Sequence, residues 1–370
     1  MKNQKKLLFL INNLSIGGAE TILVDTVNSL CDDYDITVHT VTNTGPFRER
    51  LSKKVRYRSI VRARSNFFTK VFAYIISFVV SPEFTYKKFI KDNYDYEIAF
   101  LEGVPTKLVS GSDNEKAKKY AWVHIDLNET FGLEKVHPSM DAHIECYKKF
   151  DKIICVSEAV KEAFTKRFGI TDNIMVRYNI LDDKYVLECA KEPVEKSDCV
   201  RIVSVGRLVR RKGFDRLLII MRKFKKENIN CELIIVGDGS RRQELEGYVN
   251  HHNLSDMVTF TGYCDNPYKY INSADLVVLP SRAEGYSTVA TESVIIGKPA
   301  IVCDCSGMSE IFGDSEYGVV VHNNEEDLYE AVKRMVTDNE HREYYRLKAC
   351  ERAKDFTKEK RMAELKELFK

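Results

Sequence analysis

Short apolar runs alternate with amphipathic segments along almost the whole chain, and this alternation restricts the fold more than any other feature. A continuous apolar run indicates a strand buried on both faces, and helices between successive strands produce parallel sheets covered on both sides. We therefore predict an α/β protein built from doubly wound, Rossmann-like domains. The expected strands are residues 7–11, 36–41, 96–101, 120–125 and 152–157, then 200–206, 232–237, 258–262, 276–280 and 299–303.

The length of the chain predicts two domains. It has 370 residues, and a domain typically takes about 150. A polar stretch at 180–198 contains Pro193 and precedes a new strand at Val200. We place an N-terminal domain at residues 1–185 and a C-terminal domain at 186–355. The segment from Glu325 onwards has the charged, periodic pattern of two or three helices.

Composition excludes several classes of protein. The net charge of +2 gives no reason to expect a polyanionic partner such as nucleic acid. The ten cysteines lack metal-ligand spacing, which predicts reduced thiols in a cytoplasmic protein and no metal site. The first apolar run is too short for a signal peptide, and no segment reaches the roughly 18 apolar residues that a membrane span needs.

Two glutamates flank the start of a predicted helix in the second half. The strand at 276–280 is followed by a loop with Glu284 and Gly285, and a helix is expected from about Ser287 to Gly297. Free amides at a helix N-terminus bind anions such as phosphate. Carboxylates close to a phosphate are unfavourable unless they accept hydrogen bonds from hydroxyls, so the pattern favours a nucleotide sugar. The alternative is that Ser287 caps the helix and both glutamates are solvated.

A basic loop follows the strand at 200–206. Its four cations lie where the carboxyl end of a parallel strand meets the next helix, which is where doubly wound sheets bind ligands. Such a cluster can neutralise a diphosphate leaving group, or it can be a solvated loop. The cations are Arg207, Arg210, Arg211 and Lys212, and Gly213 follows them.

Weaker signals occur at three other strand ends. Gly237 follows a buried strand, where a simple turn explains it equally well. Gly17 and Gly18 join the first strand to a helix without a complete dinucleotide-binding fingerprint. His124 ends the strand at 120–125. A lone histidine is more often structural than functional, but this position favours a role in a site.

Together these motifs resemble glycosyltransferase family 4, the retaining enzymes of the GT-B fold. The resemblance covers nearly the whole chain, and its most specific part is the basic loop combined with the spaced glutamates. It implies two facing Rossmann-like domains and a helix at 356–370 that crosses back onto the N-terminal domain. The matching segments are 17–20, His124, 156–164, 177–185, 206–213, 237–239, 284–292 and Phe356.

The resemblance also implies a role for each site residue. Arg207 and Lys212 would hold the donor diphosphate, Glu284 the sugar hydroxyls and Glu292 the ribose. His124 would lie near the reacting carbon and is counted as catalytic together with Glu284, Arg207 and Lys212. The family usually needs no divalent metal, so we expect no cofactor. The remaining donor-binding residues would be Gly17, Gly18, Gly237, Gly285, Ser287, Thr288 and Val289.

The function implied is transfer of a hexose, with a UDP sugar expected as the donor, to a lipid-linked or other glycan acceptor of the cell surface, such as capsule or exopolysaccharide. Two alternatives stay open at this point. One is a GT-B sugar-nucleotide epimerase, which would need further acid–base groups. The other is a non-catalytic subunit that only binds nucleotide sugars.

The segment at 51–82 suggests contact with a membrane. It has seven basic residues and no acidic one, and its second half is rich in aromatic and aliphatic side chains. This composition is typical of a helix at the surface of anionic lipid. We predict a cytoplasmic protein that is peripheral on the inner face of the membrane. A buried helix with a solvated basic flank is the alternative. The basic residues are Lys53, Lys54, Arg56, Arg58, Arg62, Arg64 and Lys70.

Overall fold

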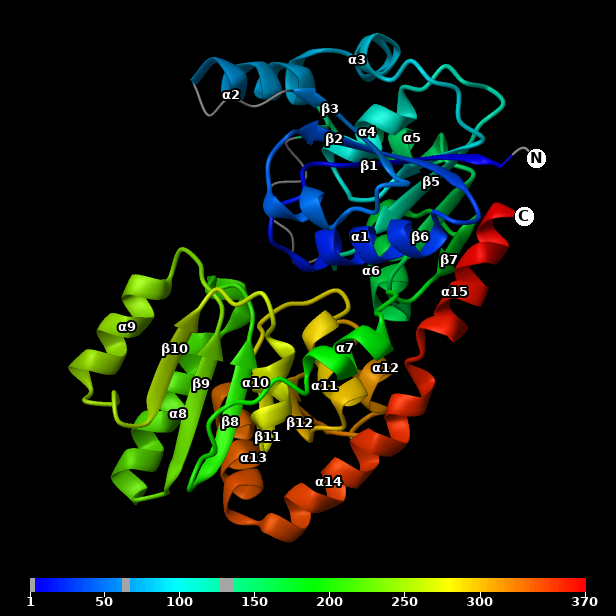
Figure 1. Cartoon of the computed structure of the whole chain (residues 1–370). Helices are drawn as coiled ribbons and strands as arrows, with labels where there is room; N and C mark the ends of the chain where they lie inside the picture. Colours follow the sequence, from blue (N-terminus) through cyan, green and yellow to red (C-terminus); the bar gives the residue numbers. More distant parts are fainter. Residues whose placement is uncertain (1–3, 62–66, 127–135) are drawn as a thin grey trace. The chain divides into compact units, whose positions relative to one another are not determined.

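Two parallel sheets organise the computed structural model of the chain (Figure 1). The structure describes residues 4–61, 67–126 and 136–370. The chain divides into unit 1, Met1–Ile180 together with Met362–Lys370, and unit 2, Leu181–Arg361. The divisions drawn from the sequence followed residues 185 and 355.

Unit 1 contains a seven-stranded sheet of order β3-β2-β1-β4-β5-β6-β7 in which every pairing is parallel. Five of these strands agree with the predicted runs to within two residues at each end. Strands β3 and β7 were not predicted, because β3 alternates arginines with other side chains and β7 is very short. The strands are β1 (Lys6–Ile11), β2 (Asp35–Thr42), β3 (Arg56–Val61), β4 (Tyr96–Ala99), β5 (Lys118–Val123), β6 (Lys152–Cys155) and β7 (Ile174–Val176).

Helices connect the strands of unit 1 and cover its sheet (Figure 1). Several begin at a serine whose hydroxyl accepts a hydrogen bond from an amide of the first turn, as Ser139 and Ser157 do. The helices are α1 (Gly18–Leu30), η1 (Pro46–Arg50), α2 (Phe67–Tyr74), η2 (Ile75–Val79), α3 (Pro82–Phe89), α4 (Val104–Ser110), α5 (Met140–Lys148) and α6 (Glu158–Phe168).

Unit 2 contains a six-stranded parallel sheet of order β10-β9-β8-β11-β12-β13. Its strand order is that of a dinucleotide-binding Rossmann sheet, so the prediction of two doubly wound domains is confirmed. Strand β13 was not predicted. The strands are β8 (Val200–Val205), β9 (Cys231–Val236), β10 (Val258–Gly262), β11 (Leu276–Leu279), β12 (Ala300–Cys303) and β13 (Val319–Val321).

The helices of unit 2 bury an apolar core against this sheet. Leu217, Leu218 and Phe224 of α8 pack with Ile202, Leu233 and other strand residues. The helices are α7 (Asp183–Cys189), η4 (Arg210–Lys212), α8 (Phe214–Glu227), α9 (Arg242–His251), α10 (Tyr268–Ser273), α11 (Thr288–Ile296), α12 (Met308–Phe312), α13 (Glu325–Thr337), α14 (Asn339–Arg352) and η5 (Ala353–Asp355).

The C-terminal segment returns to unit 1, which confirms the crossing helix. Helix α15 (Lys358–Lys366) and the turn η6 (Glu367–Phe369) end with the Phe369 ring among three tyrosines. The ring centroids lie 5.5 Å from Tyr34, 5.3 Å from Tyr96 and 6.4 Å from Tyr120. The Tyr120 hydroxyl also donates to the carbonyl of Leu368 at 2.9 Å.

Replacing Phe369 by Ala should destabilise unit 1 by about 3–5 kcal/mol, because the side chain is 1% exposed and leaves a cavity. Trp122 is the only tryptophan of the chain and lies in β5, so its fluorescence in a urea titration reports the unfolding of unit 1. Phe84→Ala, at an exposed position in α3, is the matched control. A loss for F369A no larger than the control's would show that the C-terminal segment does not stabilise unit 1.

Candidate active site

The strand order of unit 2 brings two loops together at one edge of the sheet. Strand β8 lies between β9 and β11, so the connections that follow β8 and β11 leave the sheet in opposite directions. Open α/β sheets bind ligands at this switch point, beyond the carboxyl ends of the strands. The loop after β8 is the predicted basic loop, and the loop after β11 carries Glu284.

An ion pair joins the two loops. Lys212 Nζ lies 2.5 Å from Glu284 Oε1, and the Ser281 hydroxyl donates to the same oxygen at 2.7 Å. The two side chains are largely buried, with 18% of Lys212 and 9% of Glu284 exposed. The sequence predicted both residues for the site, but it did not show that they pair or that Ser281 joins them.

The Glu284 carboxylate is held in its charged form. Burial raises its pKa, but the charge and hydrogen bond of Lys212, with smaller contributions from Ser281 and Arg211, outweigh burial and lower it below its ordinary value. The carboxylate is therefore ionised at neutral pH. A charged acceptor at this position binds hydroxyl groups strongly.

Two glycines allow the loops to approach closely. Gly213 has a φ of +70°, and a Cβ there would lie 2.0 Å from the carbonyl oxygen of Pro280, in the loop after β11. Gly237 has a φ of +142°, and a Cβ there would lie 2.0 Å from the Gly206 carbonyl. Any larger residue at either position would push neighbouring loops of the site apart.

Helix α11 presents its N-terminus at the same edge. Ser287 is the N-cap, and its hydroxyl accepts from the amide of Ala290 at 3.3 Å. The amides of Thr288 and Val289 make no hydrogen bond with the part of the chain that the structure describes. Free amides at this end attract an anion.

Both predicted glutamates are largely shielded from solvent: the Glu284 side chain is 9% exposed, and Glu292, in the second turn of α11, is 6% exposed. The alternative in which both carboxylates are solvated is therefore wrong. Gly285 is also buried, and Gly237 is half-buried. Arg207 is exposed, and its guanidinium makes no ion pair or hydrogen bond with the described residues. A cation in this state can reach a ligand without breaking an existing contact.

The other predicted site residues belong to unit 1. Gly17 is the N-cap of α1 and Gly18 is its first residue, directly after the loop that follows β1. His124 follows β5, and its imidazole lies against the rings of Phe100 and Trp122, with centroids at 4.8 Å and 6.4 Å. Burial lowers the pKa of His124 to about 3, so the ring is neutral at physiological pH.

A buried carboxylate that the sequence analysis did not select holds the backbone at His124. Glu102, in the loop after β4, accepts hydrogen bonds from the amides of His124 and Ile125, the second at 3.0 Å. Its position after a buried strand was the available signal. Strands β4 and β5 are parallel neighbours in the sheet, so a residue after β4 and His124 after β5 lie at the same edge of the sheet.

No group of three or more histidine, cysteine, aspartate or glutamate side chains within the described ranges could hold a metal ion. The expectation that the protein works without a metal remains a prediction.

Comparison with known proteins identifies the second half. Residues 189–352 match the family model described as glycosyl transferases group 1. A Campylobacter jejuni protein named as an N-acetylgalactosamine-N,N'-diacetylbacillosaminyl-diphospho-undecaprenol 4-alpha-N-acetylgalactosaminyltransferase is 33% identical over 217 residues, which are 58% of each chain. The amylovoran biosynthesis glycosyltransferase AmsD of Erwinia amylovora is 25% identical over 86% of this chain and 87% of its own.

Solved structures match the whole fold. HepE of Anabaena, in complex with UDP and glucose, superimposes with a TM-score of 0.80 over 99% of both chains at 18% identity. Residues 189–352 thus match a family of glycosyl transferases, and the chain has two Rossmann-like units of the GT-B fold.

Proposed function

We propose that this protein is a retaining glycosyltransferase that moves a hexose from a nucleotide diphosphate sugar, expected to be a UDP sugar, to a lipid-linked cell-surface glycan. The observation that carries the proposal is the largely buried Lys212–Glu284 pair, whose glutamate lies in the loop that precedes the N-terminus of α11. Cation and amides suit a diphosphate, and the carboxylates suit hydroxyls of the same molecule.

The ion pair allows a carboxylate and a lysine to lie together with little exposure to solvent. Each group neutralises the other, and Ser281 satisfies a further lone pair of Glu284. When the donor binds, the sugar hydroxyls would take over part of the hydrogen bonding of Glu284. Lys212 would then turn toward the diphosphate, together with Arg207, which has no side-chain partner among the described residues.

The proposed chemistry stabilises a leaving group. The bond between the anomeric carbon and the diphosphate breaks with its electron pair on the phosphate oxygen, while an acceptor hydroxyl forms the new bond on the same face. The departing phosphate takes the proton of that hydroxyl. Lys212, Arg207 and the amides of α11 would stabilise the charge that develops on the phosphate.

The names of the relatives support the transferase over its alternatives. The Campylobacter relative is named for a diphospho-undecaprenol substrate and the Erwinia relative for the biosynthesis of amylovoran. Two of the matching structures, both of HepE from Anabaena, contain UDP and glucose or UDP-glucose. None of these names favours an epimerase. The donor roles of Gly17, Gly18 and His124 stay part of the proposal.

Replacing Glu284 by Gln should lower kcat about 10²–10³-fold, since removing one such contact typically costs about 2.7–4 kcal/mol. Binding of UDP should persist or tighten, because Lys212 loses its competing carboxylate. Lys212→Met should instead weaken UDP binding. Calorimetric titration with UDP and assays of transfer or donor hydrolysis separate the two effects.

Glu246→Gln, which breaks a surface ion pair with Arg242 on α9, is the control and should leave both measurements unchanged. If E284Q kept full transfer activity, the assignment of the donor site would be wrong. If the wild type bound UDP sugars and never turned them over with any acceptor or water, the non-catalytic alternative would replace the transferase.

Contact with a membrane is the second part of the proposal. Helix α2 lies at the periphery of unit 1 (Figure 1), and α2, η2 and α3 expose seven large apolar side chains among their described residues. Lys88 Nζ lies 5.4 Å from the ring of Phe84, so a cation accompanies the apolar surface. The exposed residues are Val71, Phe72, Tyr74, Ile75, Phe78, Val79 and Phe84.

The basic half of the segment differs from the helix that its composition suggested. Residues 56–61 form strand β3, and Arg56 and Arg58 pair with Asp35 at 2.9 Å and Asp92 at 3.2 Å. These pairs reduce the free positive charge, and the apolar side chains would supply most of the membrane affinity. Arg62 and Arg64 lie outside the described residues, as do the side chains of Phe67, Phe68 and Lys70.

No helix in the described part of the chain has both the length and the apolar character required to cross a bilayer. We propose that the exposed apolar side chains bind the surface of the membrane on its cytoplasmic face.

The double variant Phe72→Ser with Val79→Ser should lose binding to vesicles of phosphatidylcholine and phosphatidylglycerol in a flotation assay, because it removes apolar area from the surface. Leu347→Ser, at an exposed leucine of α14 in unit 2, is the control. Equal flotation of the three proteins, or none for the wild type, would contradict the membrane contact.

A further inference from the structure

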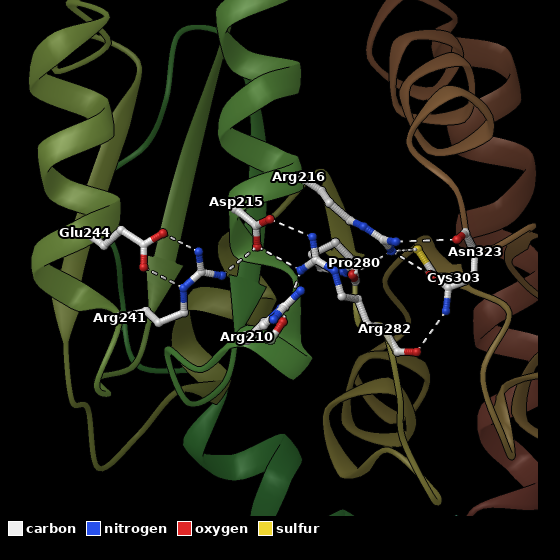
Figure 2. A network of polar contacts seen from close by, with 9 residues as sticks. All are labelled: Arg210, Asp215, Arg216, Arg241, Glu244, Pro280, Arg282, Cys303 and Asn323. Carbon is white, nitrogen blue, oxygen red and sulfur yellow. Dashed lines mark hydrogen bonds and ion pairs between the residues drawn. The ribbon is translucent and has the colours of Figure 1, made fainter. Parts of the chain in front are cut away.

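Asp215 binds two arginines from two different loops of unit 2. It is the second residue of α8. Arg282 makes a bidentate pair with it, with Nη1 at 2.9 Å from Oδ1 and Nη2 at 2.6 Å from Oδ2. Arg241 Nη1 lies 3.1 Å from Oδ1. Figure 2 shows Asp215 between the two guanidinium groups, with Arg241 also held by Glu244.

Arg282 connects this carboxylate to both halves of the candidate site. It lies two residues before Glu284, and its amide donates to the carbonyl of Arg211 at 2.7 Å. Its Nη1 also donates to the carbonyl of Arg210 at 3.0 Å. Arg282, which lies near Glu284 in the sequence, thus binds the carbonyls of Arg210 and Arg211, which directly precede Lys212.

Asn323 fixes the same loop from its other side. Its side-chain amide donates to the carbonyl of Arg282 at 3.0 Å and accepts from Arg216 Nη1 at 2.6 Å (Figure 2). The loop after β11 is therefore held between Asp215 on one side and Asn323 on the other. In this arrangement the Arg282 backbone has little freedom to move relative to α8.

The loop after β9 is bound to the same carboxylate through Arg241, the N-cap of α9. Its amide donates to the carbonyl of Leu208 at 2.9 Å, in the basic loop, and its guanidinium reaches Asp215. Burial raises the pKa of Asp215, but the hydrogen bond and charge of Arg282, and the charge of Arg241, outweigh burial and lower it. Asp215 therefore stays charged at neutral pH and can hold both arginines.

A simpler role for Asp215 is to stabilise the N-terminus of α8, as acidic residues in a first turn do. That role needs no partner in another loop. Here both carboxylate oxygens are occupied by guanidinium groups from outside the helix. Arg282 also reaches the backbone of the basic loop, which adds nothing to the stability of α8 itself.

We propose that Asp215 is a positioning residue, which acts through Arg282 and Arg241 to set the separation of Lys212 and Glu284 and so the affinity for a nucleotide diphosphate sugar. This inference rests on the proposed function of that site. Asp215 would touch no part of the donor. It would affect donor binding only through the loops that carry Lys212 and Glu284.

A double-mutant cycle on the full-length chain tests this. The ligand is UDP-glucose, or the nucleotide sugar that raises the Tm of the wild type most. Its dissociation constant is measured for the wild type, D215N, E284Q and the double variant. D215N should weaken donor binding about tenfold, and in the E284Q background it should add no more than about twofold, because residues of one network are not additive. A residue with a purely structural role would give additive losses.

Asp256→Asn is the matched control. It breaks the ion pair of Asp256 with Lys225, at the opposite end of α8 and some 15 Å along the helix from Asp215. Donor affinity should change less than about twofold. If D215N does not fold, Arg282→Lys replaces it in the cycle, since lysine keeps the charge but cannot make the bidentate pair.

Two negative outcomes are distinct. If the wild type and D256N bind the donor and D215N binds it equally well, or if the losses in D215N and E284Q are additive, the positioning role is wrong and the proposed function stands. If the wild type and every variant bind no nucleotide sugar, the proposed function and this inference fail together.

Discussion

The contact between the loop after β8 and the loop after β11 is the constraint on which the candidate site depends. Strand order brings the two loops to one edge of the sheet, and Gly213 lets the first approach the Pro280 carbonyl at a distance that no side chain would allow. The backbone bond from Arg282 to Arg211 then fixes their register. These backbone contacts place Lys212 and Glu284 within the distance of an ion pair.

Electrostatics at this edge follows from burial. A lone buried carboxylate would be destabilising, and so would a lone buried ammonium group. Together they form a neutral pair that keeps Glu284 charged. In the proposed function, the helix N-terminus would bind the anionic part of the donor and the Glu284 carboxylate would accept hydrogen bonds from its hydroxyls.

Unit 1 also has a parallel sheet, but different side chains lie at the carboxyl ends of its strands. Its edge contains a neutral histidine against two aromatic rings, and a buried glutamate that binds two backbone amides beside it. The C-terminal residues complete this unit, since the Phe369 ring fills a pocket of tyrosines next to β4 and β5. Stability of unit 1 therefore depends on the last residues of the chain, although unit 2 intervenes in the sequence.

The sequence by itself determined the class of fold, ten of the strands and the positions of the glutamates and the basic loop, because apolar runs, glycines and helix caps are local signals. It did not predict β3, whose arginines pair with Asp35 and Asp92, or the short strands β7 and β13. Only the tertiary structure decided that Lys212 pairs with Glu284 and that Asp215 joins Arg241 and Arg282. These partners are 26 to 72 residues apart, and no local pattern encodes a contact that exists only after parallel strands have aligned their ends.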